Sequence, residues 1–161
     1  MTIQLSDTAR RLIEDPFASK ALATVSADGV PHSITEDWLS VDPDGSLLVL
    51  ELNERSQTTK NLVHSIWYAR SVSILLRGSD GVSIQIRGVP IKAHVSGPFY
   101  QQHYVAVREQ YGDVDLGAVW VIEPIEELDQ SRGRELDEAR RLNGFTHLDR
   151  LTQATAQPNG N

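Results

Sequence analysis

Short turns between apolar segments limit the fold of this chain more than any other feature of its sequence. Three such turns are Ala27-Asp28-Gly29, Asp42-Pro43-Asp44-Gly45 and Gly78-Ser79-Asp80-Gly81, and each separates two strand-like runs. Aspartate, proline and glycine are residues that tight turns favour. Strands joined by only two to four turn residues must pair antiparallel. The sequence therefore predicts an antiparallel sheet and argues against a doubly wound parallel one.

The spacing of the apolar residues predicts six strands and three intervening helices. The expected strands cover residues 21–26, 30–39, 46–52, 72–76, 82–87 and 118–122. The expected helices cover residues 5–14, 57–68 and about 100–111, with Ser6 as the N-cap of the first and Gly112 closing the third. Residues 46–52 are almost continuously apolar, which is typical of a strand buried on both faces. Gly88 and Pro90 predict a bulge or an edge after the fifth strand.

The length of 161 residues suits a single domain, which we expect to cover residues 1–150. A charged, helix-prone tail falls within it, at about residues 131–150, and residues 151–161 have the composition of a disordered tail. The order of strands and helices indicates a mainly β, α+β architecture, with an antiparallel barrel and peripheral helices.

Charge and composition argue against several classes of function. The net charge of −7 argues against broad nucleic-acid binding, which needs a basic surface. No apolar stretch approaches the roughly 18–20 residues of a membrane helix, and residues 1–11 lack an apolar secretion signal. We therefore expect a cytoplasmic protein with no membrane partner. The absence of cysteine excludes disulfides and thiolate sites, and the five histidines show no metal-ligand spacing.

A polar segment between a buried strand and a helix is the most informative candidate for a binding site. Its two cations and three hydroxyl groups fall within six residues: Arg55, Ser56, Thr58, Thr59 and Lys60. Arginine can fork onto phosphate oxygens, hydroxyl groups can donate to them, and a helix N-terminus favours an anion. The segment therefore predicts a phosphate-binding loop. A simple N-cap at Ser56 with solvated charges would also account for it.

The order of these motifs resembles the opening of the pyridoxamine 5′-phosphate oxidase-like split β-barrels. The resemblance rests on Ala23-Thr24-Val25, Asp28-Gly29-Val30-Pro31-His32, Trp38, Asp44-Gly45 and residues 47–50. The following Arg55-Ser56-x-Thr58-x-x-Asn61-Leu62 is similar to the FMN phosphate loop of that family, in which Asn61 and Leu62 would serve helix packing. The resemblance covers about residues 17–126. It implies a six-stranded antiparallel split barrel with Greek-key topology, and a homodimer that holds FMN in a groove between its subunits.

The same resemblance implies further residues at the cofactor. They are Ser33, Ile34 and Thr35 on the strand beside the isoalloxazine ring, Glu51 on a neighbouring strand, Gln85 on a strand that sends a polar side chain toward the flavin, and Trp120 near the cofactor of the partner. A solvent-facing position for Gln85 and a core position for Trp120 remain open alternatives.

The resemblance implies an FMN-dependent oxidoreductase acting on a small-molecule substrate or reductant, with no catalytic side chain and no metal. The sequence departs from the B6 oxidases where they carry an Arg-Leu-His-Asp-Arg segment, because this chain continues Ser131-Arg132-Gly133-Arg134 there. This argues against true B6 oxidase activity. The alternatives are a flavin-binding protein without turnover, an interaction dimer that has lost its cofactor, a deazaflavin protein, and a haem-handling barrel with His94 or His103 as axial ligand.

Overall fold

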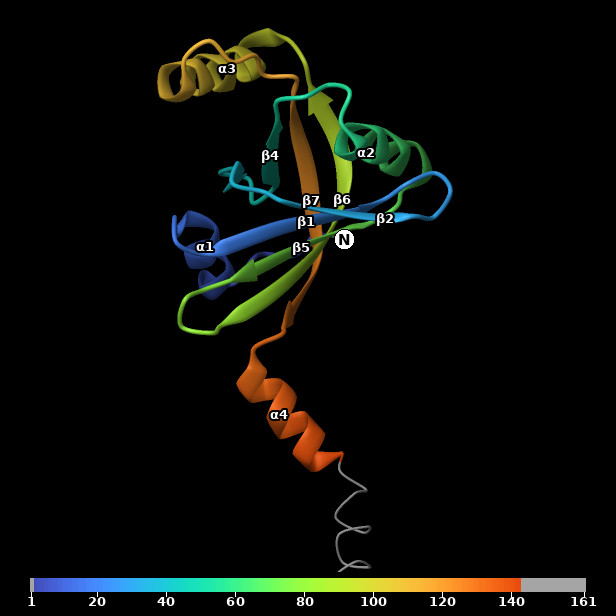
Figure 1. The fold of residues 1–161 in the computed structure, drawn as a ribbon, viewed down its shortest axis with the longest axis vertical. Helices are drawn as coiled ribbons and strands as arrows, with labels where there is room; N and C mark the ends of the chain where they lie inside the picture. Colours follow the sequence, from blue (N-terminus) through green and yellow to red (C-terminus); the bar gives the residue numbers. More distant parts are fainter. Residues whose placement is uncertain (1, 143–161) are drawn as a thin grey trace, which may run out of the picture.

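The sheet of this protein is antiparallel throughout and curls into a split barrel. The computed structural model describes residues 2–142. Their elements are α1 (Asp7–Glu14), β1 (Ser19–Val25), β2 (Pro31–Thr35), β3 (Leu39–Val41), β4 (Leu47–Glu51), α2 (Gln57–Tyr68), β5 (Val72–Arg77), β6 (Ser83–His94), α3 (Gly97–Tyr111), β7 (Ala118–Asp129) and α4 (Arg132–Arg141). The strands lie in the order β2-β1-β5-β6-β7-β4-β3 (Figure 1). The α+β antiparallel architecture is thus confirmed.

The predicted number of six strands is wrong, because the segment expected as one strand over residues 30–39 forms two. β2 pairs with β1 at one edge of the sheet, whereas β3 pairs with β4 at the other edge. The chain bends between them, where the carboxylate of Glu36 accepts the backbone N–H of Trp38 at 2.9 Å. The bend also places the carbonyl oxygen of Trp38 3.3 Å from the N–H of Leu50. The segment from Glu36 to Trp38 therefore spans the split between the two edges.

The last two long strands run further than the sequence predicts. β6 and β7 have 12 residues each and continue through Pro90 and Pro124. Their register shifts between Arg87 and Gly88 and again between Pro90 and Lys92, which confirms the predicted bulge. A side chain at Gly88 would lie 2.5 Å from Cγ2 of Ile122, so only glycine fits this close approach of the two strands.

The extension of β7 places two acidic residues on the strand. Glu126 and Glu127 lie on β7, and Glu126 forms an ion pair with Arg87 across the ladder. Glu127 accepts the backbone N–H of Ser6 at 2.9 Å and also its hydroxyl group at 2.5 Å. Both carboxylates therefore have structural partners.

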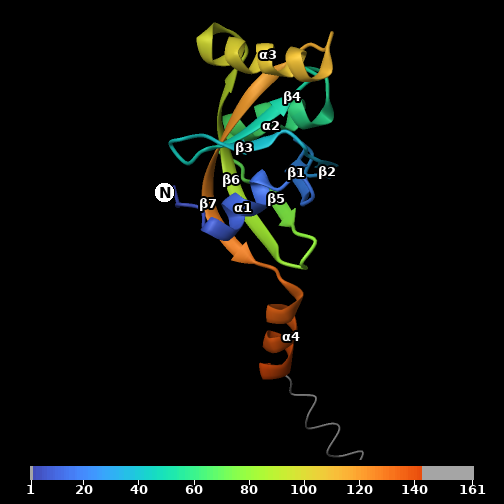
Figure 2. The ribbon, with the colours of Figure 1, turned by 90° about the vertical axis from the view of Figure 1, so that its left-hand side faces the viewer.

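The core fills the inside of the barrel, and α1 and α2 pack against it. Leu22, Ile74, Ile86 and Ile122 are at most 1% exposed, and Leu62 of α2 packs into the same cluster. A smaller cluster on the other face of β4 and β7 contains Leu48, Leu116 and Val119 and lies under α3. α4 extends away from the barrel and buries no residue (Figures 1 and 2). The tail predicted for residues 151–161 lies outside the described residues. Within residues 2–142 no helix has the length and hydrophobicity needed to cross a membrane.

Candidate functional site

The N-terminus of α2 presents free hydrogen-bond donors, as the phosphate-loop hypothesis requires. The hydroxyl oxygen of Ser56 caps the helix by accepting the N–H of Thr59 at 3.0 Å. The carbonyl oxygen of Ser56 accepts the N–H of Lys60 at 3.2 Å. The N–H groups of Gln57 and Thr58 have no hydrogen-bond partner among residues 2–142. They are the donors that an external anion could accept from.

Two cations flank these donors. Arg55 immediately precedes the cap, Lys60 lies in the first turn, and both are exposed. None of the ion pairs in the described part of the chain includes either residue. A cation whose charge is not already neutralised by a carboxylate can act fully on a bound phosphate.

The three hydroxyl groups of the loop serve the protein's own structure. The hydroxyl group of Ser56 is the cap and lies 3.2 Å from that of Thr59. The hydroxyl group of Thr59 donates to the carbonyl oxygen of Asn53 at 3.1 Å, and Thr58 is 1% exposed. The capping role that the sequence left open for Ser56 is therefore the one observed. The anion donors that remain are Arg55, Lys60 and the free backbone N–H groups.

A chain of hydrogen bonds fixes the backbone ahead of α2. The carboxylate of Glu51 accepts the N–H of Asn53 at 3.0 Å. The side-chain oxygen of Asn53 accepts the N–H of Arg55 at 2.9 Å, and its carbonyl oxygen accepts the N–H of Ser56 at 3.1 Å. The carbonyl oxygen of Glu51 also accepts the N–H of Gly117 at 2.9 Å. The loop is thus held in place before any ligand arrives.

The body of α2 is anchored to the barrel as expected from Asn61 and Leu62. The side-chain amide of Asn61 donates to the hydroxyl group of Thr24 at 2.9 Å, and both residues are buried. Gln57 donates to the side-chain oxygen of Asn61 at 2.8 Å. Leu62 is fully buried in the core. These contacts fix the direction in which the helix N-terminus points.

Ser33 and Gln85 line one hollow on the outer face of the sheet. It has a volume of about 480 Å³, and its lining is Ala21, Ala23, Ser33, Ser73, Leu75, Ser83, Gln85 and Gln130. The amide of Gln85 donates to the hydroxyl group of Ser73 at 2.8 Å, and Gln130 donates to the side-chain oxygen of Gln85 at 3.2 Å. Gln85 is half-buried and held in place, over a floor of small side chains.

A second hollow connects β2 with the start of α2. Its volume is about 330 Å³, and it is lined by the hairpin between β1 and β2 together with Gln57. Pro31 borders this hollow and Ser33 borders the larger one, so both hollows lie against β2. Gln57 at the start of α2 and Ser33 therefore border two hollows that both lie against β2.

The other predicted residues are placed differently. Ile34 packs against the core, whereas Thr35 is exposed. Glu51 ends β4, which is not adjacent to β2 in the sheet. Trp120 is 3% exposed within the core cluster, and its indole N–H has no acceptor among residues 2–142. The structure thus brings Ser33 and Gln85 together and places Trp120 in the barrel interior.

Glu36 directly follows the three residues that the resemblance places beside the ring, and the sequence did not predict its burial. It is 5% exposed, and its burial raises the pKa of the carboxyl group to about 7. The N–H of Trp38 opposes this rise in the pKa, while the nearby charges of Glu51 and Asp37 add to it. The signal in the sequence is the alternation of β2, since Ile34 and Glu36 fall on the same inward-facing side.

Of the two histidines proposed as haem ligands, His94 ends β6 and His103 lies on α3. The ring of Phe99 packs between them, 4.6 Å from His94 and 4.9 Å from His103 between centroids. Burial, with the charges of Lys92 and His103, lowers the pKa of His94. Within residues 2–142 no group of three or more His, Cys, Asp or Glu side chains has a metal-binding arrangement.

Several solved structures have a similar fold. HupZ from Group A Streptococcus matches with a TM-score of 0.67 and 16% identity, over 80% of this chain and 96% of that chain. An FMN-binding protein from Syntrophomonas wolfei matches with a TM-score of 0.63 and 15% identity, over 76% of this chain and 84% of that chain. A protein described as a pyridoxamine 5′-phosphate oxidase from Lactobacillus delbrueckii matches with a TM-score of 0.60 and 17% identity, over 78% of this chain and 93% of that chain.

An F420 reductase and HutZ, described as the haem storage protein of Vibrio cholerae, are also similar, with TM-scores of 0.57 and 0.54 and identities of 19% and 15%. The match to the F420 reductase covers 77% of this chain and 98% of the reductase chain. The match to HutZ covers 79% of this chain and 95% of the HutZ chain. No protein-family model matches the sequence, and no curated protein matches it either. Identities this low show the fold alone. At that level the resemblance is confirmed: the chain has the fold of the pyridoxamine 5′-phosphate oxidase-like split barrels.

Proposed function

We propose that this chain is an FMN-binding oxidoreductase of the pyridoxamine 5′-phosphate oxidase-like group, and that it acts in the cytoplasm as a homodimer. The observation that supports the proposal most strongly is the start of α2, where two N–H groups and two cations without partners among residues 2–142 lie on or next to a fixed loop. Such an arrangement suits a dianionic phosphate, because donors already in position cost little reorganisation on binding.

The residues of the hollow beside Ser33 and Gln85 fit the other end of the cofactor. Its floor consists largely of small side chains, which allow a flat ring to approach the sheet closely. The amides of Gln85 and Gln130 lie at its border and can donate or accept hydrogen bonds. A volume of about 480 Å³ falls within the range of small-molecule sites.

The distribution of the candidate residues supports the proposed dimer. In one subunit Arg55 lines a hollow with Asp115 and Gly117, whereas Gln85 lines a different one. A second copy packed against the outer face of the sheet would place residues of both subunits around one cofactor. Sedimentation at micromolar concentration should give a mass near twice 17.9 kDa. A stable monomer that still binds FMN would rule out a site between subunits.

The protein's part in the reaction is to bind and orient. When bound, FMN supplies the electron-transfer chemistry at its ring. Arg55 and Lys60 hold the phosphate, the small residues near Ser33 receive the ring, and Gln85 offers a hydrogen bond at its edge. No side chain has to act as an acid or a base on the substrate, so no catalytic residue is assigned.

Activity as a B6 oxidase is not part of the proposal. A substrate phosphate would need cationic donors other than those that bind FMN, because two phosphates held by the same cations repel each other. Near the C-terminus the candidates are Arg132 and Arg134, and both are exposed on α4, where Arg134 pairs with Glu138. Bound FMN should therefore not be bleached by pyridoxamine phosphate in anaerobic stopped-flow. Rapid bleaching would show that a substrate site exists after all.

The absorbance spectrum of the purified protein tests the cofactor. We expect absorbance bands in the near ultraviolet and the blue that persist after gel filtration. The compound released by heating the protein should be FMN. A Soret band would favour a haem-binding function in its place, and a single near-ultraviolet flavin-like band would favour a deazaflavin. A colourless protein that does not bind added FMN would overturn the proposal.

A further inference from the structure

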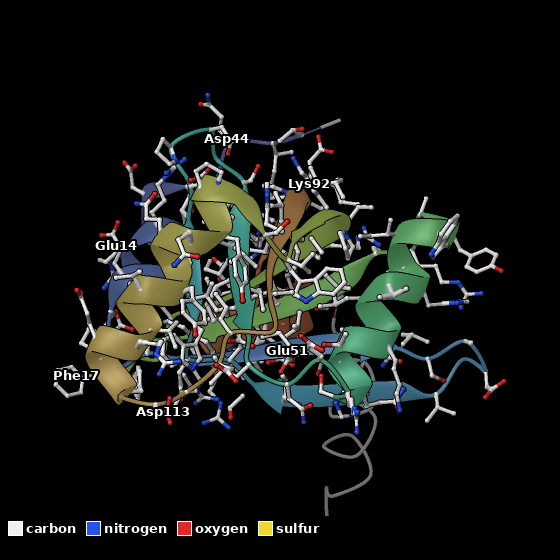
Figure 3. The ribbon with its side chains drawn as sticks, turned by 90° about the horizontal axis from the view of Figure 1, so that it is seen from above. Glu14, Phe17, Asp44, Glu51, Lys92 and Asp113 are labelled. Carbon is white, nitrogen blue, oxygen red and sulfur yellow. The ribbon has the colours of Figure 1, made fainter. Side chains whose placement is uncertain are left out.

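A buried carboxyl group lies where the two edges of the sheet meet. Glu36 follows β2, and Glu51 ends β4 on the other side of the split. Seen from above, Glu51 lies between the N-terminal end of α2 and the segment that leads from α3 to β7 (Figure 3). Of these two glutamates, Glu36 is the one that is almost fully buried, with 5% of its surface exposed. The split therefore contains an acidic group that is shielded from water.

The surroundings of Glu36 favour its neutral form. Within residues 2–142 the one hydrogen bond of its carboxylate comes from the N–H of Trp38, at 2.9 Å. The charged groups that act on it are Glu51 from β4 and Asp37 from the same bend, and both are acidic. None of the ion pairs within residues 2–142 includes Glu36. A carboxylate placed there would be poorly solvated and repelled by its neighbours.

The anion site is connected to this group through Glu51. The carboxylate of Glu51 accepts the N–H of Asn53, and Asn53 in turn holds the backbone of Arg55 and Ser56. A change in charge at Glu36 acts on Glu51 directly, and it acts on an anion at the start of α2 through the field between them.

We propose that Glu36 is a proton-binding site at the split of the barrel, and that proton binding at Glu36 and anion binding at the loop of residues 55–60 strengthen each other. The coupling rests on the proposed function, whereas the proton site does not. Its direction follows from charge: an anion on the loop makes an ionised Glu36 less favourable, and a protonated Glu36 removes one negative charge that opposes the anion. By linkage the two effects have the same size.

The proton site is tested without any cofactor. The side-chain carboxyl carbons of ¹³C-labelled glutamate are followed by NMR as the pH of the cofactor-free protein is varied. One resonance should titrate near pH 7 and be absent from Glu36→Gln, whose side-chain oxygen can still accept from Trp38. In Glu51→Gln the same resonance should titrate at lower pH, because a repelling charge is gone. If Glu36→Gln retains the resonance, or if no glutamate titrates near pH 7, the proton site is refuted.

The coupling is tested by titrating FMN, detected by flavin fluorescence, into the full chain at pH 6.5 and pH 8.5. The phosphate of FMN also titrates in this range, so the comparison is between variants at each pH. Relative to Glu36→Gln, the wild type should lose about three- to tenfold in affinity between the two values. The exposed Glu14→Gln, which changes the net charge equally, should follow the wild type.

These outcomes separate the two ideas. An unchanged ratio of wild-type to Glu36→Gln affinity at the two pH values would refute the coupling and leave FMN binding intact. If no variant binds FMN at either pH, the proposed function fails and the coupling fails with it. The NMR titration would still decide whether Glu36 is the proton site.

Discussion

Helices α2 and α4 begin alike and differ in almost everything that follows. Each is preceded by a serine, Ser56 or Ser131, and each carries two cations close to its start. Ser56 makes the capping hydrogen bond, whereas Ser131 makes none. α2 buries four residues against the barrel, but α4 buries none and extends away from it (Figure 2).

The difference extends to the cations themselves. Arg55 and Lys60 take part in no ion pair within residues 2–142, whereas Arg134 lies 3.3 Å from the carboxylate of Glu138 one turn along α4. Basic residues at a helix start therefore do not suffice for an anion site. The helix must also be fixed by its packing, and its cations must be free of internal partners.

The largest expected effect concerns the packing of the two helices. Leu62→Ala should lower the free energy of unfolding by about 2–5 kcal/mol, because Leu62 is fully buried and its loss leaves a cavity. The matched change Leu136→Ala on α4 should cost less than about 0.5 kcal/mol, since half of Leu136 is exposed. Urea denaturation measures both changes. Equal losses of stability would show that α4 is packed as firmly as α2 in solution, for example against a second copy of the chain.

The second effect concerns Glu36, the buried carboxyl group in the bend between β2 and β3. The pKa of Glu36 is about 7 in the folded protein and 4.5 as the reference for the unfolded chain. Between these pH values the unfolded chain has already lost the Glu36 proton, whereas the folded protein keeps it. The free energy of unfolding therefore falls by about 3 kcal/mol as the pH rises from 4.5 to 7, and it then levels off.

Glu36→Gln lacks this proton and should lack this loss. Relative to the wild type, the variant should therefore gain stability by about 3 kcal/mol between pH 5 and pH 8, measured by urea denaturation at each pH. A constant difference between the two proteins would contradict the buried, neutral state of Glu36.

The third prediction compares the cations of the two helices. Arg55→Ala should weaken FMN binding tenfold to a hundredfold, because a charge-assisted hydrogen bond is worth roughly 1.5–3 kcal/mol. Arg134→Ala should change the affinity less than about twofold, since this arginine already pairs with Glu138. Flavin fluorescence titrations provide both values. Similar losses for the two variants would remove the distinction between the helices.

The smallest effect is expected at the ring end of the site. Gln85→Ala removes one neutral hydrogen-bonding group from the hollow beside Ser33 and should weaken the binding of FMN and riboflavin equally, by about fivefold. The same titrations test it. A loss confined to FMN would place Gln85 near the phosphate instead of the ring.

Local patterns were sufficient to predict α2. Its bounds of residues 57–68 and its cap at Ser56 agree with the structure, because both depend on neighbouring residues. The hairpin turns and the anchoring role of Asn61 and Leu62 agree as well. The charged helix after Ser131 is also found, although nothing in the sequence indicates that it leaves the barrel.

Features that depend on distant contacts were not predictable. The split of residues 30–39 into β2 and β3 arises because each part pairs with a different edge of the sheet. The passage of β6 and β7 through prolines depends on bulges in their shared ladder. Glu36 looks like an ordinary strand residue until the bend between β2 and β3 buries it at the split.

The central claim, that the start of α2 holds the phosphate of FMN, is tested most directly by titrating the wild-type protein with FMN and with riboflavin under identical conditions. Riboflavin carries the same ring and ribityl chain but no phosphate. FMN should bind at least about tenfold more tightly, since the phosphate adds charge-assisted hydrogen bonds with Arg55, Lys60 and the free N–H groups. Equal affinities for the two compounds would contradict the assignment.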